Sequence, residues 1–124
     1  MKHLLIVDDD EDILTLLQLS LERDDFELDT CSDPVTALSR LQEKQYNLLL
    51  SDYVMDDVNG VHLLDFARQI QPNCVRILLT GSNDVDMFKK AINNSQIYKF
   101  ISKPFEVDEL IQIVDQAVEY QESL

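Results

Sequence analysis

Carboxylate, hydroxyl and ammonium side chains stand directly after four short apolar segments of this 124-residue chain. In chain order they are Asp8 and Asp9, Asp52, Thr80 and Lys103. If the segments are parallel strands of one sheet, their carboxyl ends share an edge, which is where open sheets of this kind bind ligands. Carboxylates held close together repel each other unless a cation neutralises them. Because Mg²⁺ prefers oxygen ligands, this placement predicts a divalent-cation site.

The same side chains are suited to phosphoryl transfer. A carboxylate can attack phosphorus and form an aspartyl phosphate. The transferred oxygens then need positive charge and hydrogen-bond donors, which a metal ion, the Lys103 ammonium group and the Thr80 hydroxyl would supply. Each residue also has an ordinary structural interpretation, such as helix capping for Asp10 or a strand exit for Asp52. Their joint placement after successive apolar segments favours a site.

The segments that precede these residues have the composition of strands. Continuous apolar runs are typical of strands buried on both faces of a parallel sheet. One segment alternates apolar and polar residues instead, as an edge strand does. The predicted strands cover residues 4–7, 26–31 (the alternating segment), 48–52, 75–79 and 97–101.

Helical periodicity separates these strands. Asp33 and Pro34 resemble an N-cap followed by proline at the first helical position. Apolar residues at offsets of three and four form five stripes: Ile13, Leu16, Leu17 and Leu21; Val35, Leu38 and Leu41; Val61, Leu64, Ala67 and Ile70; Val85, Phe88 and Ile92 of a helix over 84–92; and Val107, Leu110, Ile111, Val114, Ala117 and Val118. Five strand–helix repeats predict an α/β fold whose parallel sheet is covered by helices on both faces.

Composition excludes several classes of protein. The chain has 24 acidic and 10 basic residues, a net charge of −14, which disfavours direct binding to nucleic acid or to an anionic membrane. No apolar run approaches the ~20 residues of a membrane span, and the amino terminus does not resemble a signal peptide. Cys31 and Cys74 have no metal-binding spacing, so we expect both to be ordinary core residues of a protein in a reducing cytoplasm. With glycine only at positions 60 and 81, a glycine-rich nucleotide loop is also excluded.

Over essentially its whole length the chain resembles the receiver domain of two-component response regulators. The resemblance rests on Val7-Asp8-Asp9, on Asp52 followed by Met55 and Gly60, on Thr80-Gly81, and on Lys103-Pro104-Phe105. It implies one domain over residues 1–124 with the (βα)5 flavodoxin-like fold, a doubly wound five-stranded parallel sheet of order 2-1-3-4-5. It also implies a cytoplasmic signalling protein.

The resemblance assigns roles to the residues at the predicted sheet edge. Asp52 would accept a phosphoryl group from a histidine kinase or a histidine phosphotransfer protein. Mg²⁺ would be bound by Asp8, Asp9, Asp52 and the backbone carbonyl of Val54, while Thr80 and Lys103 would contact the phosphoryl group. A protein of this kind is a phosphoacceptor, which catalyses only its own phosphorylation and dephosphorylation.

The resemblance also implies a switch and an output surface. Thr80 would move toward the phosphoryl group while Phe100, three residues before the lysine, rotates inward. This would reshape the face formed by the helix over 84–92, the strand over 97–101 and the final helix, which would contact an output domain or a protein partner. Tyr98 is expected on the same strand face as Phe100. A phosphorylation-dependent dimer stays among the alternatives.

Charge is unevenly distributed along this predicted output face. Residues 87–103 contain four lysines and no acid, whereas residues 104–124 contain six acids and no base. The face would be locally basic on an acidic protein, unless Lys89 and Lys90 are simply solvated helix residues.

Some positions depart from the family pattern. Asp56 stands where the family commonly has proline, and together with Asp57 it adds negative charge near the predicted metal site. Val54 and Ser82 occupy two positions at which the family tunes dephosphorylation; the valine side chain cannot hydrogen-bond an attacking water, whereas the serine can.

Two other functions compete with the phosphoacceptor hypothesis. A Mg²⁺-dependent phosphatase that passes through an aspartyl phosphate usually needs a second aspartate two residues after the nucleophile, where this chain has Val54, and a cap over the substrate. A receiver-like scaffold that is never phosphorylated would not need the complete set of acids, threonine and lysine. Both stay as alternatives.

Overall fold

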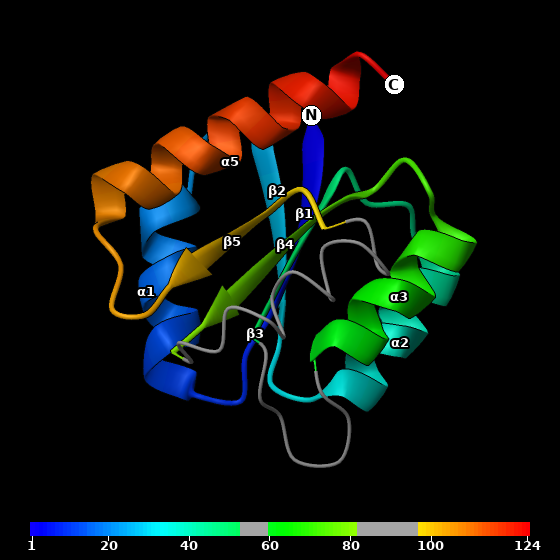
Figure 1. Cartoon of the computed structure of the whole chain (residues 1–124), viewed down its shortest axis with the longest axis horizontal. Coiled ribbons are helices and arrows are strands. Elements are labelled where there is room, and N and C mark those ends of the chain that lie inside the picture. The colour runs from blue at the N-terminus through cyan, green and yellow to red at the C-terminus, as the bar shows by residue number, and fades with distance from the viewer. Residues whose placement is uncertain (53–59, 82–96) are drawn as a thin grey trace.

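Five parallel strands form one sheet in the order β2-β1-β3-β4-β5 (Figure 1). The computed structural model describes residues 1–52, 60–81 and 97–124, with the backbone alone at 60 and 61. The strands are β1 (Lys2–Val7), β2 (Phe26–Cys31), β3 (Leu48–Asp52), β4 (Val75–Thr80) and β5 (Lys99–Ser102), and the helices are α1 (Glu11–Leu21), α2 (Pro34–Glu43), α3 (Gly60–Ile70) and α5 (Val107–Glu122). The predicted flavodoxin-like topology is confirmed, and the predicted helix over 84–92 lies outside the described residues.

Helices cover both faces of the sheet, with α1 and α5 on one side and α2 and α3 on the other (Figure 1). The two core layers follow the alternation of the strands. On β1, Leu4 and Ile6 pack with α1 and α5, whereas Leu5 and Val7 pack with the opposite layer. All four are essentially inaccessible to solvent. Burial on both faces explains why these strands lack polar alternation.

Two helices begin at the residues that local chemistry predicts. The Asp10 side chain accepts hydrogen bonds from the backbone N–H groups of Asp12 and Ile13 at the start of α1. Asp33 accepts from the N–H of Thr36, with Pro34 in the first turn of α2. An N-cap satisfies donors that the helix itself cannot, which is typically worth ~1 kcal/mol.

The predicted apolar stripes of α1 and α2 are wrong at two positions. Two residues of the other predicted stripes, Ile70 at the end of α3 and Val107 at the start of α5, are also exposed, at 39% and 36%. On α1 and α2, Leu16 is 40% exposed and Val35 is 67% exposed. Their helices present Leu14, Leu17 and Leu21, and Pro34, Ala37 and Leu41, to the core. Because each helical residue turns by about 100°, these stripes point Leu16 and Val35 away from the sheet.

Cys31 and Cys74 are both buried and not joined in a disulfide, as predicted. Burial raises the pKa of the Cys74 thiol to about 12, so this thiol is uncharged at neutral pH. None of the helices in the described ranges combines the length and the apolar character that crossing a bilayer requires.

Gln71 joins the loop before β3 to the loop before β4, at the edge opposite the predicted site. Its buried side chain accepts a hydrogen bond from the backbone N–H of Tyr46 at 2.8 Å. It also donates to the backbone carbonyls of Leu41 and Lys44, each at 2.7 Å. These two carbonyls at the end of α2 thereby gain a hydrogen-bond donor. These bonds anchor the amino end of β3, the strand that carries Asp52.

Gln71→Glu should lower the free energy of unfolding by roughly 1–3 kcal/mol, because the substitution keeps the size but removes both donors to buried carbonyls. Urea denaturation would measure the change. Gln112→Glu, on the exposed face of α5, is the matched control and should change stability by less than about 0.5 kcal/mol. Equal effects of the two substitutions would contradict the structural role of Gln71.

A second polar cluster stabilises the edge strand β2. Asp29 accepts hydrogen bonds from the Tyr46 hydroxyl at 2.7 Å and from the Lys44 ammonium group at 3.2 Å. Burial by itself raises the pKa of Asp29, but these two hydrogen bonds outweigh it and leave the pKa below its ordinary value. The carboxylate therefore stabilises the folded state when it is charged.

Because the folded-state pKa of Asp29 is lowered, its stabilising contribution is present above the unfolded pKa of about 4 and is lost as pH falls further. We expect wild type to exceed Asp29→Asn in free energy of unfolding by about 1 kcal/mol at neutral pH. This difference in free energy of unfolding should shrink as the pH is lowered toward about 3. Urea titrations across this range would measure it, with the exposed Glu43→Gln as control. A gap that is constant with pH would contradict the assignment.

Candidate functional site

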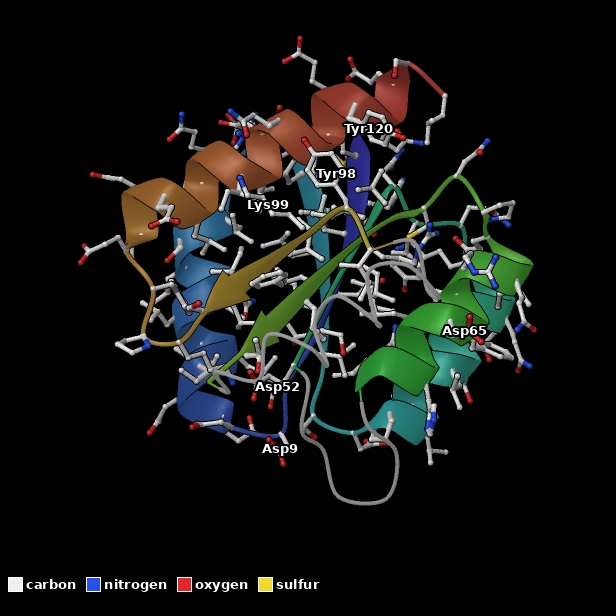
Figure 2. The ribbon with its side chains drawn as sticks, viewed as in Figure 1. Asp9, Asp52, Asp65, Tyr98, Lys99 and Tyr120 are labelled. Atoms are coloured by element: carbon white, nitrogen blue, oxygen red, sulfur yellow. The ribbon has the colours of Figure 1, made fainter. Side chains whose placement is uncertain are left out.

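Three carboxylates meet at the carboxyl edge of the sheet, as their positions just after β1 and at the end of β3 predict. Asp8, Asp9 and Asp52 each offer one oxygen, and these three oxygens lie within 4.8 Å of one another. Asp8 is fully buried and Asp52 is 7% exposed, whereas Asp9 is exposed to solvent. Figure 2 shows Asp9 and Asp52 together at the edge to which the strands point. The cluster is therefore open to solvent on the side of Asp9.

Lys103 lies between the two buried carboxylates. Its Nζ donates to Asp8 Oδ2 at 2.9 Å and to Asp52 Oδ1 at 3.0 Å. Burial by itself lowers the pKa of Lys103, but the hydrogen bonds to Asp8 and Asp52 outweigh it and hold the pKa above its ordinary value. The ammonium group is thus a fixed positive charge at neutral pH, and it offsets part of the repulsion between the carboxylates.

The backbone after β1 holds Asp8 in place. The Asp10 N–H donates to Asp8 Oδ1 at 2.9 Å, while the Asp8 N–H donates to the Cys31 carbonyl at 3.1 Å. The Asp10 carboxylate serves as the N-cap of α1, which confirms its structural interpretation. Asp8 therefore uses one oxygen for the loop and the other for Lys103.

Thr80 and Lys103 are held together by backbone pairing. Thr80, the last residue of β4, is 1% exposed and pairs in register with Ser102 of β5. The Lys103 N–H then donates to the Thr80 carbonyl at 2.7 Å, just beyond the regular ladder. The ends of β4 and β5 thus deliver a hydroxyl and an ammonium group to the same edge of the sheet.

The predicted switch residue Phe100 is half-buried on β5 and packs in the layer with α2 and α3. Tyr98 does not share its face, contrary to prediction. It packs in the layer with α1 and α5, and its ring lies 5.2 Å from the ring of Tyr120. The alternation fails because β5 begins only at Lys99, so Tyr98 lies before the regular strand. Figure 2 shows Tyr98 and Tyr120 beside each other.

Several predicted residues lie outside the described part of the chain. They are Val54 with its backbone carbonyl, Met55, Asp56, Asp57, Ser82, Lys89 and Lys90.

A family model described as the response regulator receiver domain matches residues 4–115. The chain belongs to this family. A signal receiver domain of an HD domain-containing protein from Pseudomonas fluorescens Pf-5 superimposes with a TM-score of 0.94 at 36% identity, covering 99% of this chain and 98% of that one. A CheY-like receiver domain from Methanospirillum hungatei JF-1 gives a TM-score of 0.92 at 27% identity, with 99% and 98% coverage.

Relatives of this receiver domain differ greatly in length. The chain is 32% identical to the transcriptional regulatory protein GlrR of Escherichia coli K12 over 94% of its own residues, but it spans only 26% of that protein. By contrast, it is 29% identical to the response regulator receiver protein CpdR of Brucella abortus and spans 96% of it, with 94% of this chain covered.

The donor chemistry of the receiver site fits a hard divalent cation. Its three carboxylate oxygens are the ligand type that Mg²⁺ prefers, and the exposed side of the cluster leaves room for water ligands. The half-buried Lys103 ammonium group places a positive charge at this edge, next to Asp8 and Asp52.

Proposed function

We propose that this receiver domain takes one phosphoryl group onto Asp52 and uses it to switch a protein contact surface. The observation that carries the proposal is the Asp52 carboxylate, nearly buried, beside two further acids and hydrogen-bonded to Lys103. A lone surface acid would have none of these partners. The family of the chain is one of phosphoacceptors, which supports the same function.

In the proposed reaction an Asp52 carboxylate oxygen attacks the phosphorus of a phosphohistidine or a small acyl phosphate. A P–O bond to Asp52 forms as the bond from phosphorus to the donor breaks, and the donor keeps the bonding electron pair. A phosphohistidine donor leaves as a neutral, protonated imidazole, and an acyl phosphate leaves as its carboxylate. The product is an aspartyl phosphate. The Lys103 ammonium group and the Thr80 hydroxyl would hydrogen-bond the phosphoryl oxygens, which gain negative charge next to the protein.

Asp8, Asp9 and Asp52 would hold Mg²⁺ in this function. The ion would supply positive charge that neutralises the carboxylates and the incoming phosphoryl oxygens. In the described residues, Lys103 forms ion pairs with both buried carboxylates and offsets part of their charge. The contribution of the Val54 carbonyl stays a prediction.

Phosphorylation would change the surface that contains β5 and α5. The proposed route runs from Thr80 to Phe100, which is on the neighbouring strand of the sheet. We propose a histidine kinase or histidine phosphotransfer protein as the donor, and an output domain or separate protein as the partner. We also propose that residues 1–124 are a single receiver domain, with one core layer on each face of its sheet.

Beryllofluoride, a mimic of an attached phosphoryl group, tests the proposal on the wild-type protein. We expect binding that requires both beryllofluoride and Mg²⁺ and that shifts the amide NMR signals of Thr80 and Phe100. A small acyl phosphate with Mg²⁺ should add one phosphoryl group per chain. Lack of any Mg²⁺-dependent change would favour a phosphorylation-independent scaffold, and sustained turnover of a phosphomonoester would favour the phosphatase alternative.

A further inference from the structure

Ser51 is a buried polar residue directly before the proposed phosphoacceptor. It follows three leucines on β3 and is wholly inaccessible to solvent. A hydroxyl in such a place destabilises the fold unless it is hydrogen-bonded. The Ser51 Oγ donates to the backbone carbonyl of Asp52 at 3.0 Å. The Ser51 hydroxyl is therefore hydrogen-bonded to Asp52, the phosphoacceptor of the proposed function.

Asp52 is the last residue of β3. The ladder between β1 and β3 ends with the pair Val7 and Ser51. The ladder between β3 and β4 continues one residue further, to Asp52 and Leu79. Asp52 is thus paired in register with β4 at the very end of its strand. The hydrogen bond from Ser51 adds a local restraint at this last residue.

From this geometry we infer that Ser51 is a positioning residue for Asp52. By holding the Asp52 peptide group, it fixes the backbone from which the carboxylate reaches Lys103 at 3.0 Å and the oxygens of Asp8 and Asp9. Sites of this kind need their reacting groups held within about 0.5 Å. The inference rests on the proposed function, because it assigns Ser51 an effect on phosphoryl uptake at Asp52.

Ser51→Ala, Ser51→Thr and Ser20→Ala test this role. Ser20 is the control, because its hydroxyl donates to a backbone carbonyl within α1, away from the site. We expect Ser51→Ala to weaken Mg²⁺-dependent binding of beryllofluoride and to slow acyl-phosphate labelling by roughly tenfold, as loss of a supporting partner does at other sites. Ser51→Thr, which keeps the hydroxyl, should restore most of both. Ser20→Ala should leave both unchanged.

The carbonyl ¹³C chemical shift of Asp52 supplies a readout that needs no phosphorylation. It should change in Ser51→Ala and return toward the wild-type value in Ser51→Thr. If wild type fails to bind beryllofluoride, the proposed function is wrong, and an unchanged carbonyl shift in Ser51→Ala would separately disprove the hydrogen bond. If wild type binds and Ser51→Ala binds equally well, or loses only thermal stability, the positioning role is overturned.

Discussion

Asp52→Asn should abolish phosphoryl uptake from a small acyl phosphate while the fold is retained. The amide has nearly the same shape as the carboxylate, but its oxygen is a poor nucleophile and carries no charge for a cation. The hydrogen bond from Lys103 can still reach the amide oxygen, so the contact at 3.0 Å does not by itself require the charge. Intact-protein mass spectrometry would measure the uptake, and circular dichroism would check the fold.

Asp24→Asn is the matched control for this experiment. Asp24 is exposed and precedes β2, so it lies toward the opposite edge of the sheet from the site. The control protein should take up one phosphoryl group, as wild type does. If Asp52→Asn is labelled to the same extent as Asp24→Asn, then Asp52 is not the acceptor.

Lys103→Met should destabilise the metal-free protein and make it respond more strongly to Mg²⁺. Methionine keeps the length of the side chain but removes the cation between Asp8 and Asp52. Because Asp8 is completely buried, its carboxylate then has less compensation for its lost hydration. We expect the free energy of unfolding to fall by roughly 1–3 kcal/mol at neutral pH, as measured by urea denaturation.

Mg²⁺ should reverse much of that loss, because a cation that binds only the folded state stabilises it. The rise in melting temperature on adding Mg²⁺ should therefore be larger for Lys103→Met than for wild type. Lys99→Met, which removes an exposed lysine from β5, the strand that precedes Lys103, is the control and should behave as wild type does. A smaller rise in melting temperature for Lys103→Met than for wild type would show that Mg²⁺ does not replace the charge of Lys103 at these carboxylates.

Local chemistry explains why so much of the fold was predictable from sequence. The N-caps at Asp10 and Asp33 depend on contacts within three residues, and the buried strands on runs of adjacent apolar residues. The failures are equally local in origin. Leu16 and Val35 are apolar, but the helix face that meets the sheet is chosen by neighbours such as Leu14 and Ala37.

The sequence alone determined that acids, a hydroxyl and an ammonium group follow successive strands, since order along the chain sets which end of a parallel strand they occupy. Only the tertiary structure decided which of them touch. Lys103 contacts Asp8 across 95 positions of the chain and Asp52 across 51. Likewise, the pairing of β3 with β1 ends at Ser51 and its pairing with β4 ends at Asp52. Both end points depend on the register of the three strands. Register and side-chain contacts arise from packing between distant segments, so neither is encoded in any short stretch of sequence.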